Sequence, residues 1–590
     1  MAEAALPKKQ SAWRTLLLAL SNRKTGFMLI FGFAAGLPYA LLLGTLYAWL
    51  TQAEVDLETM GVFSLIGLSY AFKFLWSPAL DRIDLPAFRR LGKRKQWIVP
   101  AQLLLGGILV TLSLLDPGSQ LGLFSLLAGL GAFASATQDV VIDAWRVDVA
   151  DDVATIDILS AVYQMGYRIA ALVGGALALI LAERLGWPTV YAIMGAILLT
   201  VGFFGLFAPD ADTKAMKALE NEAGDDPYGL REAGQVVPKV RAWALGAVAL
   251  LWGWALFTVV VFMVRSLSSD PESRPDSVEF ISTMGPLVVV ATVVVPALIA
   301  AWLVRLQRRG DRVIPAQVTD DEQIQTGSYH SPYAAESGFD RMIDHLYRAL
   351  ILPLTEFVGR MGWALVLVLA LVLTYRITDS IWGTFAYPFY LGELNYTLDE
   401  VAVASKFFGV GALIAGLALG GFMLTVLGRM TTLFLGALLA ALTNLLYADL
   451  AIGGFRMAAV SDAIGFTWLI EQFGGNQALA KLMVTIFAEN LAVGIAGAAF
   501  VAWLSSIVAK GYSAVQYALL SSLTMLVGTL GRGALGQLIE EQGYFYVFIL
   551  TTLIGFVAVV LVGIEWWRVS RLKDKAGIVA PEARETAPAE

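Results

Sequence analysis

Residues 136–168 read ATQDVVIDAWRVDVADDVATIDILSAVYQMGYR, and they place charge inside otherwise apolar sequence. Apolar, Gly- and Ala-rich sequence precedes them from residue 121, and apolar sequence follows to residue 182. Asp139 and Asp143 are four residues apart, so a helix carries both carboxylates on one face. The next helix repeats that spacing in two pairs, Tyr163 with Tyr167 and Gln164 with Arg168. Because ionised groups in a bilayer are costly, this stretch predicts a polar cavity between membrane-spanning helices.

Composition places the whole chain in a membrane. Of its 590 residues 58% are hydrophobic and only 15% are charged, and several apolar runs reach twenty residues or more. Such runs predict a polytopic α-helical membrane protein. The chain has no cysteine and two histidines, His330 and His345, both in a polar loop. We therefore expect no disulfide, no metal site and no cofactor.

The apolar runs predict about fourteen spans in three groups. Six fall in a first bundle (26–208), two in an inserted pair (242–304) and six in a second bundle (361–567). Tails (1–25, 568–590), a linker (209–241) and a loop (305–360) complete the chain. Lys and Arg concentrate in both tails and in the loops, so both termini are predicted to be cytoplasmic. The expected spans are 26–50, 60–80, 97–115, 121–143, 158–182, 187–208, 242–264, 282–304, 361–390, 400–427, 430–449, 478–503, 513–535 and 544–567.

The two six-helix blocks are weakly related to each other. Residues 173–191 (VGGAL…LGWPTVY) are similar to residues 530–546 (LGRGAL…QGYFY), with one gap. Parallel repeats of six helices are the plan of the major facilitator fold, which binds its substrate between the halves near the midplane. The fold class that we expect is therefore an all-α integral membrane protein with the major facilitator fold and an inserted helix pair.

Further ionisable residues lie within the predicted spans. Lys73 lies in the second, Arg376 and Asp379 share one face of the ninth, and Glu489, followed by Asn490, lies in the middle of another. Arg376 with Asp379 has an alternative interpretation as a structural ion pair. A carboxylate surrounded by apolar groups takes up a proton more readily, which a proton carrier requires, so Asp139 and Glu489 are the candidate carriers.

Asp143 has two interpretations that the sequence leaves open. It is near the cytoplasmic end of its span, where it would carry a proton or would order the following loop with Arg146. The aromatic residues near the charged faces are also ambiguous, because Trp and Tyr line membrane interfaces as well as sugar-binding sites. For any single one the interface is the favoured interpretation. The candidates for sugar stacking are Trp145, Tyr163, Tyr167, Trp382 and Tyr387.

Six motifs in order along both blocks resemble the AmpG family of muropeptide permeases. They are GFAAGLP (32–38), FKFLWSPALDR (72–82), TQDVVIDAWRVDV (137–149), YRITD (375–379), FAENL (487–491) and SAVQYALLSS (513–522). The resemblance implies an inner-membrane major facilitator transporter that imports anhydromuropeptides with the proton gradient, an activity linked in this family to β-lactamase induction. It implies a polar set of Lys73, Gln138, Asp139, Asp143, Arg168, Arg376, Asp379, Glu489 and Gln516.

The chain departs from shorter members of that family in three places. Arg376 stands where Lys is common, the outer segment 452–477 is longer, and the inserted pair with its loop is additional. The resemblance predicts a proton-coupled importer of anhydromuropeptides, with protons and the lipid bilayer as its other partners, no nucleic acid, and a monomeric state. The alternatives are a permease for another large anion such as acetyl-coenzyme A, and a membrane-embedded cell-wall enzyme. The absence of a Ser/His/Asp set and of His from every span argues against the enzyme.

Overall fold

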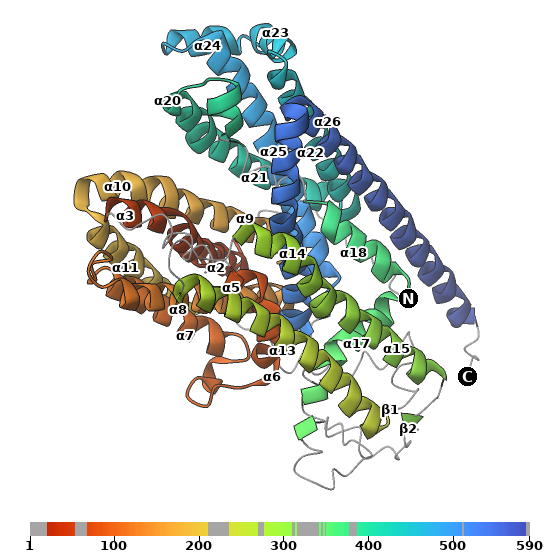
Figure 1. Ribbon diagram of the computed structural model, residues 1–590. Coiled ribbons are helices and arrows are strands. Elements are labelled where there is room, and N and C mark those ends of the chain that lie inside the picture. The colour runs from red at the N-terminus through yellow and green to blue at the C-terminus, as the bar shows by residue number, and fades with distance from the viewer. Residues whose placement is uncertain are drawn as a thin grey trace, which may run out of the picture. The chain divides into compact units, whose positions relative to one another are not determined.

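The computed structural model consists of α-helices, with one short two-stranded sheet (Figure 1). It describes residues 21–53, 68–209, 235–268, 277–309, 313–314, 342–343, 346–348, 350–376, 386, 388–509 and 512–585. The chain divides into two compact units. The first comprises residues 1–362 and 504–533, and the second comprises residues 363–503 and 534–590.

The first unit contains the first six-helix block. Two of its helices, α2 and α9, approach closely because glycines face backbone: a Cβ on Gly32 would collide with the Tyr163 carbonyl, and one on Gly166 with the Leu29 carbonyl. Small residues at such crossings let membrane helices pack tightly. The elements of the block are α2 (Arg23–Ala40), η1 (Leu41–Thr45), α3 (Leu46–Gln52), α5 (Leu68–Ala71), η3 (Lys73–Leu75), α6 (Ser77–Arg82), η4 (Arg89–Leu91), α7 (Lys95–Leu112), α8 (Leu121–Val149), α9 (Ile156–Leu172), η5 (Val173–Leu177), α10 (Ala178–Leu185) and α11 (Trp187–Gly205).

Helix α2 continues through Pro38, although proline has no N–H to donate. The carbonyl four residues earlier, that of Ala34, accepts instead from the side-chain amide of Gln138 on α8, at 2.7 Å. The helix then widens into the π-helical turn η1. The fully buried Gln138 therefore supplies the hydrogen bond that Pro38 removes from α2.

The inserted pair also belongs to the first unit. It consists of α13 (Pro238–Ser268) and the rod α14 (Ser277–Val289), η7 (Val290–Val294) and α15 (Val295–Arg309). Trp252 of α13 donates to the Thr292 carbonyl and packs edge-on against Phe74 of η3. Strands β1 (Gln235–Val236) and β2 (Val313–Ile314) flank the inserted pair in sequence and form an antiparallel pair.

Helix α17 (Leu352–Met361) ends the first unit and packs against α15, where Arg308 donates to the Gly359 carbonyl at 3.1 Å. Gly362, with φ of 55°, separates α17 from α18 (Ala364–Thr374) at the boundary between the two units. Of the expected span 361–390, the structure describes helix α18 and the turn to residue 376, whereas residues 377–385 and 387 lie outside the described residues.

The second unit contains the rest of the second block. Its elements are α18, η9 (Pro388–Glu393), α20 (Leu398–Val401), η10 (Ala402–Gly409), α21 (Val410–Val426), α22 (Arg429–Ala451), α23 (Phe455–Ala463), α24 (Phe466–Gln472), most of α25 (Gln477–Ser506) and the later part of α26 (Ser513–Glu585). Gly543, with φ of 79°, divides α26 into two helices. Residues 504–533, the end of α25 and the start of α26, pack with the first unit.

Within the described residues, eleven helices are long and apolar enough to cross a membrane, or twelve if α17 with α18 counts as one span. The eleven match eleven of the fourteen expected spans, and α17 with α18 overlaps a twelfth, 361–390. The other two, 60–80 and 513–535, do not meet that test; part of 60–80 lies outside the described residues, and 513–535 lies within α26. The chain is a multi-pass membrane protein.

Candidate functional site: a charged cluster on α8 and η3

Four charged side chains meet inside the first unit. The Lys73 ammonium lies 2.5 Å from Asp139 Oδ2 and 3.8 Å from Asp143 Oδ2, and Arg146 lies 3.0 Å from Asp143 Oδ1. Three of these side chains are almost completely buried, whereas Asp139 retains 13% of its side-chain exposure. We call these four residues the α8 cluster. Two cations and two carboxylates compensate one another there.

Lys73 was predicted as a cation of the site, but its pairing with Asp139 was not. Along α8 the nearest charge to Asp139 is the like-charged Asp143, so the sequence suggested repulsion. In the structure Lys73 also reaches Asp139, from the separate element η3. The Tyr163 hydroxyl also donates to Asp139, at 2.8 Å from Oδ1. Asp139 is therefore held by two groups from neighbouring elements.

Arg146 connects the α8 cluster to residues 504–533. Its guanidinium lies between two aromatic rings, 4.6 Å from the Tyr163 centroid and 5.0 Å from that of Tyr517. Its Nε donates to Ser505 Oγ at 3.2 Å. Asp143 and Arg146 thus form the predicted pair, and that pair contacts the end of α25 and the start of α26. Sequence reasoning missed Tyr517 and Ser505, because they lie more than 350 positions away.

A second buried charge cluster, also missed, lies at the ends of α6, α7 and α8. Arg94 forms ion pairs with Asp81 at 2.8 Å and with Asp148 at 2.6 Å, and it donates to Ser513 Oγ. Asp81 accepts from the Val515 backbone N–H in the first turn of α26. A carboxylate at a helix N-terminus is favourable for its dipole. This cluster fastens the start of α26 to the first block.

Gln516, one of the predicted binding residues, is engaged with α17. Its amide donates to the Pro353 carbonyl and to Glu356, and its oxygen accepts from the Ala509 N–H. These bonds join α17 to the turn between α25 and α26. A substrate contact by Gln516 stays a prediction.

In the second unit Glu489 accepts from the Tyr447 hydroxyl at 2.6 Å, and the Tyr447 oxygen lies 2.9 Å from that of Tyr390. The Asn490 amide lies 3.4 Å from Glu489 and donates to the Ile486 carbonyl. Tyr447 and Tyr390 were missed, because their paired hydroxyls leave no spacing signal in the sequence.

Arg376, just beyond α18, lies near α25. Its guanidinium Nη1 is 4.0 Å from the position that a Cβ on Gly497 would occupy. Gly497 is eight residues beyond Glu489, about 12 Å along the helix axis. The glycine leaves room for the guanidinium beside α25.

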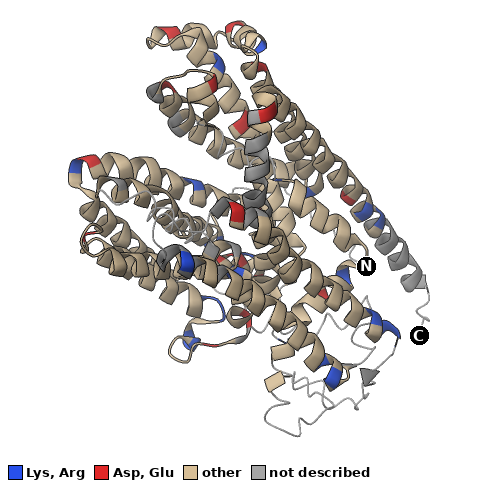
Figure 2. Cartoon of the chain, in the orientation of Figure 1, with Lys and Arg blue, Asp and Glu red and all other residues tan. Residues whose placement is uncertain are grey.

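The remaining predicted site residues lie outside these charged clusters. Trp145 is fully buried and donates to the Pro209 carbonyl, and the Gln138 amide donates to the Ala34 carbonyl of α2. Both side chains therefore stabilise the packing of α8 within the first unit. Tyr167, Gln164 and Arg168 are partly exposed on α9, whereas Tyr163 is buried. Asp379, Trp382 and Tyr387 lie outside the described residues. Figure 2 shows charged positions mainly at helix ends and in loops, which makes those within long helices distinctive.

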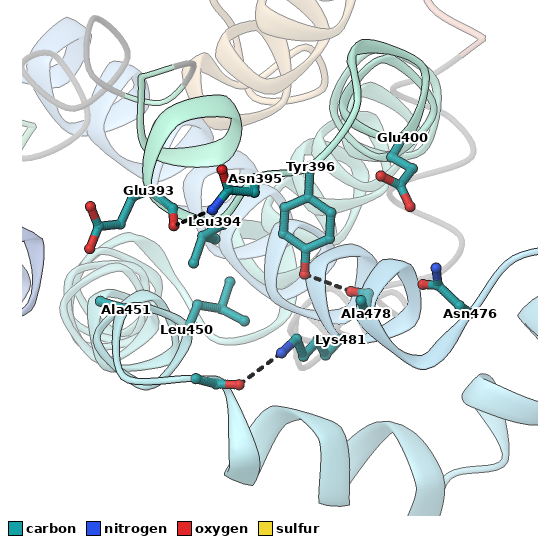
Figure 3. A pocket seen from close by; sticks show the side chains of 11 residues that line it. Glu393, Leu394, Asn395, Tyr396, Glu400, Leu450, Ala451, Asn476, Ala478 and Lys481 are labelled. Atoms are coloured by element: carbon teal, nitrogen blue, oxygen red, sulfur yellow. Dashed lines mark hydrogen bonds between the residues drawn. The ribbon is translucent and has the colours of Figure 1, made fainter.

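A pocket of about 440 Å³ opens elsewhere in the second unit, at the ends of α22 and α25 (Figure 3). The Tyr396 hydroxyl crosses it to the Ala478 carbonyl, and the Lys481 ammonium donates to the Gly453 carbonyl. None of the predicted site residues lines it. Its lining residues are Glu393, Leu394, Asn395, Tyr396, Glu400, Leu450, Ala451, Gly453, Asn476, Ala478 and Lys481.

The chain is similar to anhydromuropeptide permeases along nearly its whole length. The "Anhydromuropeptide permease" of Escherichia coli K12 is 27% identical over 558 residues, which cover 93% of this chain and 82% of that protein. The "Putative transporter AmpG 4" of Rickettsia conorii is 24% identical over 90% of this chain and 93% of its own length. A family model described as "Acetyl-coenzyme A transporter 1" matches residues 26–123.

Solved structures confirm the fold class. The major facilitator proton:xylose symporter XylE, bound to 6-bromo-6-deoxy-D-glucose, covers 93% of this chain at 10% identity, with a TM-score of 0.50. A double-Trp variant of XylE covers 91% with a TM-score of 0.51. The chain therefore has the major facilitator fold.

Proposed function

We propose that the chain imports anhydromuropeptides, disaccharide-peptides with a 1,6-anhydro sugar, from periplasm to cytoplasm across the bacterial inner membrane. The observation that carries this proposal is its similarity to anhydromuropeptide permeases over 93% of its length. The α8 cluster adds a physical reason, since buried charges within transporter helices mark substrate and proton pathways. We propose a monomer that depends on the proton gradient and on no cofactor.

The proposed coupling step is an exchange of partners at Lys73. The peptide of the substrate carries carboxylates, which would compete with Asp139 for the Lys73 ammonium. Asp139, released from its cation in a largely apolar site, would then take up a proton. Return of Lys73 to Asp139 after substrate release would expel that proton on the other side. Asp139 suits this role better than Asp143, because Asp143 is also paired with Arg146.

Arg168 and Arg376 would supply further cations for the substrate carboxylates, one from each six-helix block. Tyr163, Tyr167, Gln164, Trp382 and Tyr387 would contact its sugar rings and amides. Alternation between two access states would then carry substrate and proton together.

We further propose that both termini and the loops 81–96, 209–239 and 307–358 are cytoplasmic. Their excess of Lys and Arg supports this orientation. Because the chain has no cysteine, one cysteine introduced in each loop reports its side by reaction with an impermeant maleimide. Labelling of the 307–358 loop from outside intact cells would contradict the proposed topology.

Uptake into proteoliposomes tests the transport proposal directly. Purified protein is reconstituted with an imposed proton gradient, and labelled anhydromuropeptide is added outside. We expect accumulation above the external concentration, which a protonophore abolishes. Equal uptake by protein-free vesicles would overturn the proposal.

Acetyl-coenzyme A is the second candidate substrate, favoured by the family model that matches residues 26–123. The same proteoliposomes distinguish the two. Under our proposal a large excess of acetyl-coenzyme A leaves anhydromuropeptide uptake unchanged, whereas unlabelled anhydromuropeptide suppresses it.

A further inference from the structure

The outer segment 452–477 forms a compact helical hairpin that the transport proposal does not use. It consists of α23 and α24, nine and seven residues long, between α22 and α25. Figure 1 shows both short helices at one end of the second unit, lying across the direction of the long helices. Helices of that length cannot cross a membrane.

Defined turns and hydrogen bonds fix the conformation of the hairpin. Glycines with positive φ form its corners: Gly453 and Gly454 before α23, Gly465 between the helices and Gly474 after α24. The Met457 N–H donates to Asp449 on α22, and the Thr467 hydroxyl donates to Ser461. Its inner face is therefore fixed, and its outer face is a defined surface.

Several large apolar side chains are exposed on the hairpin, among the exposed polar residues Arg456, Asp462, Glu471 and Gln472. Phe455, Ile464, Trp468 and Phe473 are 77%, 65%, 66% and 83% exposed, and Val460 and Leu469 are exposed beside them. Residues 463–470, at the tip of the hairpin, include no charged side chain. Soluble surfaces rarely expose an apolar patch of this kind without a partner.

The position of the hairpin identifies the partner. Helices α22 and α25 have 23 and 30 residues, so each alone exceeds the bilayer hydrocarbon core of about 30 Å. The hairpin that joins them therefore lies at the level of the lipid headgroups. The exposed stripe of α22 leads into it: Leu445 and Ile452, seven residues apart, share a face, and exposed Phe455 follows.

We infer that α23 and α24 lie in the membrane interface, with the face of Phe455, Ile464, Trp468 and Phe473 inserted among the lipids. A tryptophan on an otherwise aliphatic and aromatic face is typical of interfacial helices. Arg456, Asp462 and Glu471 give the segment a formal charge of −1, so the surface does not require anionic lipid. Gly453 and Asn476, at the two ends of the segment, also line the pocket in Figure 3.

Depth measurements in the cysteine-free chain test this inference. Single variants Ile464→Cys and Leu469→Cys, which retain Trp468, carry a nitroxide label in phosphatidylcholine proteoliposomes. Asp152→Cys, in the exposed loop between α8 and α9, is the water-accessible control. We expect labels at 464 and 469 to collide with oxygen more often than the control, and with a water-soluble nickel complex several-fold less often.

Two outcomes would overturn the inference. Nickel-complex accessibility at 464 and 469 equal to that at 152 would place these residues in water. Dipolar broadening between labels on different chains, with both reagents excluded, would assign the face to a second copy. Each labelled variant is first checked for a monodisperse elution profile, so that misfolded protein does not imitate either result.

Discussion

The fourth helix of each six-helix block carries a carboxylate, but the two carboxylates have different partners. On α8, Asp139 is paired with the Lys73 ammonium and accepts from the Tyr163 hydroxyl. On α25, Glu489 accepts from the neutral hydroxyl of Tyr447 and lies beside the neutral amide of Asn490. The repeated architecture thus supports two kinds of acidic site.

Protonation of the two carboxylates would therefore have different consequences for their partners. Neutral Asp139 would leave a buried ammonium with a weaker partner, so its protonation is coupled to whatever else binds Lys73. Neutral Glu489 would weaken the hydrogen bond that it accepts from Tyr447. Because a substrate carboxylate would compete directly for Lys73, a carrier that must sense an anionic substrate fits the α8 cluster.

The largest expected effect follows from Asp139→Asn. The amide keeps the shape of the side chain but cannot bind and release a proton. We expect the variant to exchange labelled for unlabelled substrate across a liposome membrane, yet to lose accumulation against a gradient. Counterflow and accumulation are measured on the same preparation.

Glu489→Gln is the matched control for that variant. Under our proposal it retains accumulation. If Asp139→Asn concentrates substrate as well as the unmodified chain while Glu489→Gln does not, the proton belongs to Glu489 and our assignment is wrong.

Lys73→Met tests the ion pairs themselves. The substitution leaves two carboxylates in the α8 cluster with only Arg146, and breaking a buried pair destabilises proteins by about 3–5 kcal/mol. We expect a clear fall in the midpoint of thermal unfolding in detergent. The double variant Lys73→Met/Asp139→Asn should unfold at a higher temperature than Lys73→Met alone, because it removes the uncompensated charge. A double variant less stable than Lys73→Met would contradict the pairing.

Arg376→Gln should weaken substrate binding without unfolding the chain. A hydrogen bond to a charged group contributes about 1.5–3 kcal/mol, so we expect about a tenfold or greater loss of affinity. Equilibrium binding of labelled anhydromuropeptide measures it, with the thermal midpoint as the folding control. Unchanged affinity would remove Arg376 from the site.

Local sequence patterns predicted most of the fold and part of the site. Apolar runs located the eleven spans that the described residues show, because a span must satisfy its backbone hydrogen bonds within one helix whatever its neighbours are. The i, i+3 pair of Asp143 and Arg146 was also predicted. Both depend on residues that are close in the chain.

Contacts between distant segments were not predictable in this way. Lys73 and Asp139 are 66 positions apart, and Arg94 and Ser513 are 419 apart. Only the packing of the helices brings them together. The role of Gln138 also could not be predicted without the helix packing. Pro38 leaves the Ala34 carbonyl without its helical donor, and only the packing of α8 against α2 brings the Gln138 amide to it. The break between α17 and α18 at Gly362 was missed because apolar sequence continues on its C-terminal side.

The smallest expected effect is that of Tyr447→Phe. The substitution removes the hydroxyl that donates to Glu489 but keeps the ring, which stacks on Phe548 at 5.4 Å. We expect a loss of about 1–2 kcal/mol in stability, the contribution of one such hydrogen bond. Tyr390→Phe, which removes only the outer hydroxyl of the pair, should have a smaller effect still. If Glu489 merely supports structure, both variants accumulate substrate as the unmodified chain does. A loss of accumulation in Tyr447→Phe, with counterflow intact, would instead move the proton pathway to α25 and reverse the contrast between the two helices.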